Sequence, residues 1–209
     1  MDREQSQMVH GGLLLFVLAV FIWSIIKPAI FSLWILEVLP AVVLLIVVIA
    51  VYNRFRFTTL SYFIIAMLSI LMFIGGHYTY SKVPLFNWIK DVLELHRNHY
   101  DRFGHFMKGL LVIVIRELLL RKTPLKKGKW LFFISVSIIL AISALYEIIE
   151  WLAFVIGKKG ITTENFLGAQ GDRWDAQWDM LLAFLGSILG LMVLSRWQND
   201  QLNKLLNKK

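Results

Sequence analysis

The sequence contains no cysteine, only four prolines and few charged residues. The absence of cysteine excludes disulfides and thiolate metal sites, so any metal would have to be bound by nitrogen and oxygen atoms. Charged residues make up 17% of the 209 residues, whereas hydrophobic residues make up 58%. This balance is too apolar for an ordinary soluble domain. The sequence therefore predicts an integral membrane protein.

Six apolar runs are long enough to cross the hydrocarbon core of a bilayer, which takes a helix of about 20 residues. Lys27-Pro28 follows the first run where a small-residue cleavage site would be needed, so we interpret this run as a helix and not as a removable signal. We predict an all-α polytopic membrane protein, with one bundle of about six transmembrane helices over residues 1–209. The predicted spans cover approximately residues 11–31, 33–51, 58–76, 103–120, 130–156 and 176–195.

Two segments between the spans have distinct patterns. Residues 84–96 are amphipathic, which favours a helix lying in the membrane surface on the outer side, either as a lid or as a simple connector. Residues 157–171 contain four glycines and predict an outer loop with tight turns. Within the last span, Gly186 and Gly190 form a G-x-x-x-G pattern, which favours close packing between helices.

The distribution of lysine and arginine indicates the orientation of the bundle, because short cytoplasmic loops retain these residues. With both termini in the cytoplasm, 12 of the 22 basic residues fall on the cytoplasmic side. The formal net charge of +8 then follows from topology and from attraction to anionic lipids of the bilayer. We therefore expect no nucleic-acid partner.

Several ionisable residues lie in or beside the spans, where such side chains are expensive and by default functional. In the predicted topology they all fall at the outer ends of helices, and Glu37 and His77 lie in the same layer. The inner ends are expected to carry only lysine and arginine. We infer a polar pocket that opens outward. Its members are His99, Asp101, His105, Glu147, Glu150, Asp172, Asp175 and Asp179.

The spacing of these residues places them on common helix faces, because residues three or four apart are neighbours on a helix. Asp101 and His105 are four apart, Glu147 and Glu150 are three apart, and Asp179 follows another aspartate by four. Histidine with carboxylates suits a divalent Zn, Mn or Fe ion. The same groups are equally suited to acid and base chemistry without a metal.

Three interpretations of this cluster stay open: catalysis, transport or sensing, and a purely structural network of ion pairs. For catalysis, the tentative metal ligands are His105, Asp101, Glu147 and Glu150, and these four with Asp179 share the chemistry. Residues expected to contact substrate or to support the ligands are His77, Tyr78, His99, Tyr100, Arg102, Asp172, Arg173 and Asp175.

Four strings resemble the signature of the YjdF family of bacterial inner membrane proteins: GGHYTY at 75–80, HYDRFGHF at 99–106, YEIIEW at 146–151 and GDRWDAQWDM at 171–180. The resemblance covers essentially the whole chain. It implies a multipass protein of the bacterial inner membrane and names no activity.

A more distant similarity is to the VanZ-like family, which is associated with glycopeptide resistance. Its pattern is D-K-x-x-H-F, then E-x-x-Q, then an arginine before D-x-x-x-N-x-x-G-x-x-x-G. The matching residues are Asp101, Arg102, His105, Phe106, Glu147, Arg173, Asp179, Gly186 and Gly190, whereas Arg102 replaces lysine, Glu150 replaces glutamine and Ala183 replaces asparagine.

From these residues together we predict a hydrolase or transferase acting on a lipid-linked or cell-envelope substrate at the outer leaflet. A metal at His105 would activate water and polarise a phosphoryl or acyl oxygen. The competing prediction is a non-catalytic membrane protein, namely a small-molecule transporter, a proton relay or an envelope-binding factor.

Overall fold

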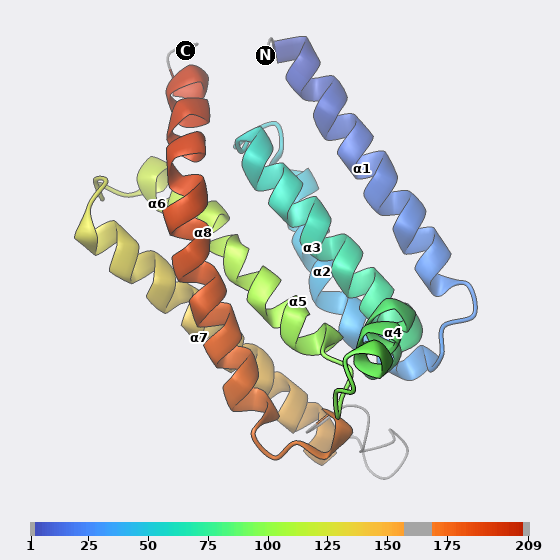
Figure 1. The fold of residues 1–209 in the computed structure, drawn as a ribbon. Coiled ribbons are helices and arrows are strands. Elements are labelled where there is room, and N and C mark those ends of the chain that lie inside the picture. Colours follow the sequence, from blue (N-terminus) through green and yellow to red (C-terminus); the bar gives the residue numbers. More distant parts are fainter. Residues whose placement is uncertain (1–2, 157–168, 207–209) are drawn as a thin grey trace.

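The computed structural model describes residues 3–156 and 169–206, and within these ranges helices are joined by short turns and irregular segments, with no strand. The turns η1, η2 and η4 are short 3₁₀ helices at Tyr80–Lys82, Gly109–Leu111 and Ala169–Gly171. The α-helices are α1 (Arg3–Ile25), α2 (Phe31–Val51), α3 (Thr59–Tyr78), α4 (Pro84–Val92), α5 (Tyr100–Lys108), α6 (Val112–Lys122), α7 (Lys129–Ile156) and α8 (Asp175–Leu206) (Figure 1).

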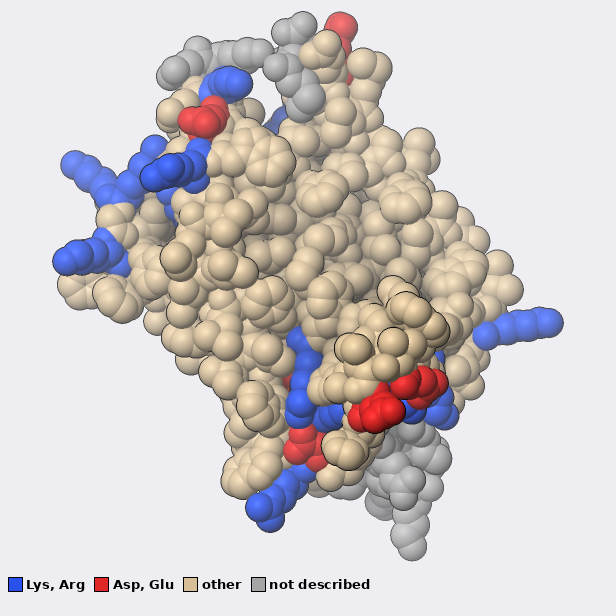
Figure 2. All heavy atoms as spheres, viewed as in Figure 1, with Lys and Arg blue, Asp and Glu red and all other residues tan. Residues whose placement is uncertain are grey.

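Among the described residues, five helices are long and apolar enough to cross a membrane: α1, α2, α3, α7 and α8. The run predicted as a further span at 103–120 corresponds to α5, η2 and α6, which follow one another without a break. Figure 2 shows the charged side chains gathered toward two ends of the molecule, with a broad apolar band between them. The prediction of an all-α polytopic membrane bundle is confirmed.

Several helix boundaries differ from the predicted spans. Helix α1 begins at Arg3 and ends at Ile25, because Lys27 adopts a positive φ of 52° and turns the chain toward α2. The amphipathic segment 84–96 is helical only over Pro84–Val92. Of the predicted loop 157–171, residues 157–168 lie outside the described residues, and the remainder forms η4.

The two termini lie at the same end of the bundle, which we call the terminal end; the opposite end, crossed by α4, is the site end (Figure 1). Helices α1 and α2 pack on α3, which contacts α5 in turn. On the other side, α8 packs on α5 and α7 packs on α8. The segment from α5 to α6 is therefore the centre of the bundle.

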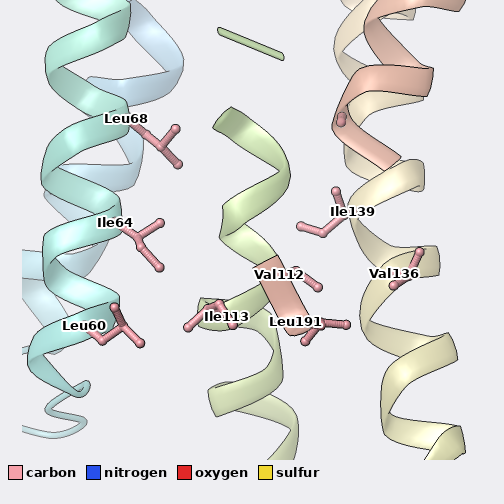
Figure 3. Packing of buried hydrophobic residues seen from close by; sticks show 9 residues of the cluster. Leu60, Ile64, Leu68, Val112, Ile113, Val136, Ile139 and Leu191 are labelled. Atoms are coloured by element: carbon pink, nitrogen blue, oxygen red, sulfur yellow. The ribbon is translucent and has the colours of Figure 1, made fainter. Parts of the chain in front are cut away.

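An apolar core fills the middle of the bundle between α3, α6, α7 and α8 (Figure 3). Val112 and Ile113 are completely buried at its centre. The labelled side chains in Figure 3 come from all four helices and point toward one another: Leu60, Ile64, Leu68, Val112, Ile113, Val136, Ile139 and Leu191.

Glycines allow α5 and α8 to approach closely, as the G-x-x-x-G pattern predicted. A Cβ atom on Gly186 would overlap the backbone oxygen of Phe106, and one on Gly109 would lie 2.6 Å from the backbone nitrogen of Ser187. Close backbone contact of this kind needs residues without side chains. It brings Asp179, one turn before Ala183, onto the α5 side of the bundle.

Candidate functional site

The site end contains a polar cluster centred on His105, a side chain that is only 2% exposed. Its Nε2 atom lies 3.6 Å from Oδ1 of Asp101, one turn earlier on α5, and 4.0 Å from Oδ2 of Asp179 on α8. Its Nδ1 atom lies 3.8 Å from Oε1 of Glu147 on α7. Three helices thus bring together four of the residues predicted to share the chemistry.

Lys108 supplies the positive charge in this cluster. Its Nζ lies 2.9 Å from Nε2 of His105 and 4.1 Å from the centre of the Tyr146 ring. An ammonium group can only donate, so Nε2 of His105 is the acceptor. We infer from this bond that the proton of the neutral imidazole is on Nδ1, facing Glu147. The cluster therefore offers an N–H donor beside a carboxylate.

Several buried polar atoms of the cluster have no hydrogen-bond partner in the described structure: Nδ1 of His105, Oε1 of Glu147, Oδ1 of Asp179 and Oε2 of Glu37. Each such group within a bilayer is destabilising by several kcal/mol, as an order of magnitude, unless something satisfies it. Buried unsatisfied groups also point to a bound water, ion or ligand. The cluster is therefore a candidate binding site.

A metal would find donors of suitable chemistry here. Asp101, His105 and Asp179 each offer one ligand atom, and the three atoms lie within 4.8 Å of one another. Imidazole and carboxylate oxygen suit Zn, Mn or Fe. However, the ammonium of Lys108 already occupies the lone pair of Nε2. A metal bound through that atom would have to displace Lys108.

A network of ion pairs lies beside the cluster at the site end. Arg97 donates to Asp172 at 3.1 Å and to Asp175 at 2.9 Å, and Arg102 donates to Asp172 at 2.5 Å. Asn98 and Gln170 exchange two hydrogen bonds, of 2.8 and 2.9 Å. These contacts join the segment before α5 to the segment before α8.

At this end, Asp172 and His99 lie outside the membrane-spanning helices and have shifted pKa values. The pKa of Asp172 is lowered, first by the hydrogen bond from the backbone N–H of Trp174 and then by Arg102 and Arg97. The pKa of His99 is lowered by partial burial and, to a lesser extent, by the same two arginines. Asp172 is therefore held as a carboxylate, and His99 is neutral at pH 7.

Other predicted site residues lie away from His105. His77 donates from Nδ1 to the backbone oxygen of Ser24 at 3.1 Å, and its ring packs on Trp23 and on Tyr78. The hydroxyl of Tyr100 donates to a backbone oxygen of α3. In the described contacts, these side chains join helices to one another.

Two further predicted residues lie at the margin of the cluster. Glu150 follows Glu147 by three residues on α7, so the two share a face, and it is partly exposed. Arg173 lies over the ring of Trp174, with 5.1 Å between its guanidinium carbon and the ring centre. Neither residue forms a described hydrogen bond to His105.

The sequence prediction omitted Lys108 and Tyr146 from the site. The signal for Lys108 was present, because it is a cation three residues after His105 within a predicted span. Tyr146 had no signal beyond its place in the YEIIEW string, since aromatic residues are common throughout this chain. Arg97 was also omitted, because its partners Asp172 and Asp175 lie more than 70 residues away in the sequence.

The expectation that the inner helix ends carry only lysine and arginine is wrong. At the terminal end, the fully buried carboxylate of Glu117 accepts hydrogen bonds from the Thr58 backbone and hydroxyl, from Ser61 and from Arg121, at 2.6 to 3.2 Å. It therefore ties α6 to the first turn of α3. Because this carboxylate is fully partnered, it differs from the His105 cluster and has a structural role.

Comparisons with known proteins agree with this picture of a membrane bundle. The family described as predicted membrane protein (DUF2238) matches residues 9–200. The inner membrane protein YjdF of Escherichia coli (strain K12) is 39% identical over 172 residues, which is 82% of this chain and 81% of that protein. No solved structure matches the chain.

Proposed function

We propose a function from the premise that the chain belongs to the YjdF family of predicted membrane proteins (DUF2238), with a place in the bacterial inner membrane. The proposal is that the His105 cluster is the active site of a membrane-embedded hydrolase or transferase. Its substrate would be a lipid-linked or cell-envelope molecule that enters from the periplasmic side. The VanZ-like resemblance stays a prediction and is not needed for this proposal.

The observation that carries the proposal is a set of buried atoms on three helices that have no hydrogen-bond partner within residues 3–156 and 169–206. Nδ1–H of His105 faces the interior as a donor, while Oε1 of Glu147 and Oδ1 of Asp179 face it as acceptors. Carboxylates this close to one another share protons, because several negative charges cannot be desolvated together. Such a set can both accept and deliver protons in one place.

These roles allow a balanced reaction. A free carboxylate oxygen, on Glu147 or Asp179, would accept the proton of an attacking water or hydroxyl group as its oxygen bonds to a phosphoryl or acyl centre. His105 Nδ1–H and Lys108 would stabilise the negative charge that develops on the substrate oxygen. A protonated carboxyl group of the cluster would then give its proton to the departing oxygen, so that the bond to the leaving group breaks with protons conserved.

The apolar core favours an active site over a proton relay. Val112 and Ile113, both fully buried, lie between the His105 cluster and the polar groups around Glu117. The distance along the helix from His105 to Glu117 is about 18 Å, at roughly 1.5 Å per residue. Apolar side chains thus separate the His105 cluster from the terminal end. This arrangement suits chemistry on a substrate that enters from the site end.

A metal-dependent form of the same activity is the second candidate, supported by the proximity of donors on Asp101, His105 and Asp179. If bound there, a divalent ion would act as a Lewis acid toward a substrate oxygen. Metal analysis of purified protein tests this form, with His105→Ala as the control. Equal metal content in the two proteins would remove it.

The proposed activity is tested by comparing lipid and envelope extracts of cells that lack the gene with those of complemented cells. We expect a lipid-linked species to accumulate in the deletion strain and to disappear with the wild type or with Asp91→Asn, an exposed carboxylate on α4. We expect Asp179→Asn to leave it accumulated although the variant protein is present in the membrane. Full complementation by Asp179→Asn, or identical extracts throughout, would overturn the proposal.

A further inference from the structure

A cavity lies at the terminal end, far from the His105 cluster. It has a volume of about 400 Å³ and lies between α1, α2 and α3. Its walls are mostly apolar, with Leu14 and Val17 on α1, Val48 on α2 and Ile65 on α3. The volume is within the range of roughly 300–1,000 Å³ that ligand pockets occupy. This cavity has no part in the chemistry proposed above.

One end of the cavity is polar and fixed in position. His10 lies 3.0 Å from the hydroxyl of Tyr52 and 3.0 Å from the hydroxyl of Thr59, through its two ring nitrogens. It therefore joins α1 to the end of α2 and to the start of α3. Both contacts satisfy the buried imidazole of His10, so they fix the distance between these helices at the position of His10. These hydrogen bonds therefore fix the shape of the cavity at its polar end.

Glycine leaves one wall of the cavity open. Gly11 lines the cavity, and a Cβ atom added to it would meet nothing within 4 Å. Gly11 and Ile49 are also exposed at the protein surface. Since this surface belongs to helices that cross the membrane, the opening faces lipid. An occupant can enter sideways from the bilayer without first crossing water.

A positive charge lies at the polar end. The guanidinium carbon of Arg56 is 4.8 Å from the centre of the Tyr52 ring, and Tyr52 lines the cavity. Arg54, two residues earlier, is exposed near the same turn. Basic residues at the membrane surface attract anionic lipid headgroups. The cavity thus combines an apolar interior, a lateral opening and a cationic rim.

We propose that this cavity binds one acyl chain of an anionic phospholipid from the leaflet on the side of the termini, with the lipid phosphate beside Arg56. The apolar walls match the chain, and the charge of Arg56 matches the headgroup. The lipid fills the space that Gly11 leaves and packs α1 against α2 and α3. This site is independent of the His105 cluster and of its proposed activity.

The test uses full-length protein in vesicles that contain phosphatidylglycerol with a photoreactive acyl chain. After illumination, the modified residues are mapped by mass spectrometry. We expect adducts on cavity residues such as Leu14 and Ile65 in the wild type. Gly11→Phe adds a ring at a residue that lines the cavity and is expected to lower these adducts about tenfold. Gly12→Phe is the matched control, because Gly12 has equal space around it but does not line the cavity.

A second arm examines the headgroup. Arg56→Gln with phosphatidylglycerol, and the wild type with photoreactive phosphatidylcholine, are both expected to give fewer adducts than the wild type with phosphatidylglycerol. Equal labelling in the wild type, Gly11→Phe and Gly12→Phe would overturn the proposal, since it would indicate only general lipid contact. Cross-linked dimers without lipid adducts would overturn it as well. The unfolding temperature of each variant is measured to check that it is folded.

Discussion

At the scale of single residues, the charge of Lys108 is the feature on which the His105 cluster depends. It is the cation beside His105, within a group of carboxylates that belong to three helices. Removing one partner from a buried group of charges leaves the others uncompensated. The side chain of Lys108 is only partly buried, so the effect is smaller than for a fully enclosed pair.

We therefore expect Lys108→Met to lower the free energy of unfolding by about 2 kcal/mol, below the roughly 3–5 kcal/mol typical of fully buried pairs. Thermal unfolding in detergent measures the change. Adding Asp101→Asn to the same protein is expected to recover part of the loss, because it removes one uncompensated carboxylate. Lys82→Met, at an exposed position, is the control. An unfolding temperature that is identical in Lys108→Met and the wild type would contradict this account.

The lowered pKa of Asp172 predicts that the stability of the fold depends on pH. Its pKa in the folded protein lies below the ordinary value of 3.8. A carboxylate with a lowered pKa stabilises the fold at pH values above the unfolded pKa, and this contribution disappears as the pH falls through the folded pKa. We expect the contribution of Asp172 to be constant from neutral pH down to about 3.8 and to be lost below it.

The measurement is the unfolding temperature as a function of pH for the wild type and Asp172→Asn. The variant is expected to be less stable at neutral pH, because Arg97 and Arg102 lose an anionic partner. The two curves are expected to converge in acid. Curves that stay parallel down to the lowest pH would show that Asp172 makes no such contribution.

At the scale of elements, the contact between α5 and α8 decides whether the site is assembled. Gly186→Ala would place a methyl group against the backbone of Phe106, which cannot move as a flexible side chain does. Overpacking of this kind is destabilising by about 1–3 kcal/mol. At Gly190 the nearest atom is Cδ2 of Leu110 at 3.0 Å, and this side chain can shift.

We expect Gly186→Ala to lower the unfolding temperature more than Gly190→Ala does. Gly12→Ala, with nothing within 4 Å, is expected to be neutral or slightly stabilising, since alanine favours a helix by roughly 1 kcal/mol over glycine. Thermal unfolding of the three variants in the same detergent gives the comparison. Equal effects at Gly186 and Gly190 would argue against the close backbone contact.

At the scale of the whole molecule, both termini lie at one end of the bundle and the His105 cluster lies toward the other. The excess of basic residues at the terminal end predicts that this end is cytoplasmic. The chain has no cysteine, so single cysteines can be introduced without a background. Leu206 at the terminal end and Leu93 near the site end are both exposed.

We expect a membrane-impermeant maleimide to label Leu93→Cys in intact spheroplasts and to label Leu206→Cys only after the membrane is permeabilised. The wild type, which contains no thiol, is the control for unspecific labelling. The reverse pattern would place the His105 cluster on the cytoplasmic side. In that case a periplasmic substrate would be excluded.

The close spacing of Asp101 and His105 made their proximity predictable from sequence, because a helix places residues four apart on one face. The pairing of this face with Glu147 and Asp179 depended on the predicted topology, which brought the corresponding helix ends to one side. By contrast, the contact between His105 and Lys108 depends on rotamers, and the Arg97 network depends on loop geometry. Periodicity indicates only that Lys108 and His105 share a helix face, and it does not indicate the partners of Arg97.

By itself the sequence determined the all-α membrane class and the family, since long apolar runs have few other stable forms in a bilayer. It also indicated which charged residues are candidates for a functional site, because unpaired charge is energetically costly in lipid. Only the tertiary structure decided which of these charges are partnered. Glu117 is satisfied and structural, whereas atoms of His105, Glu147 and Asp179 have no hydrogen-bond partner among the residues that the structure describes. That difference depends on contacts between distant segments, which local pattern cannot encode.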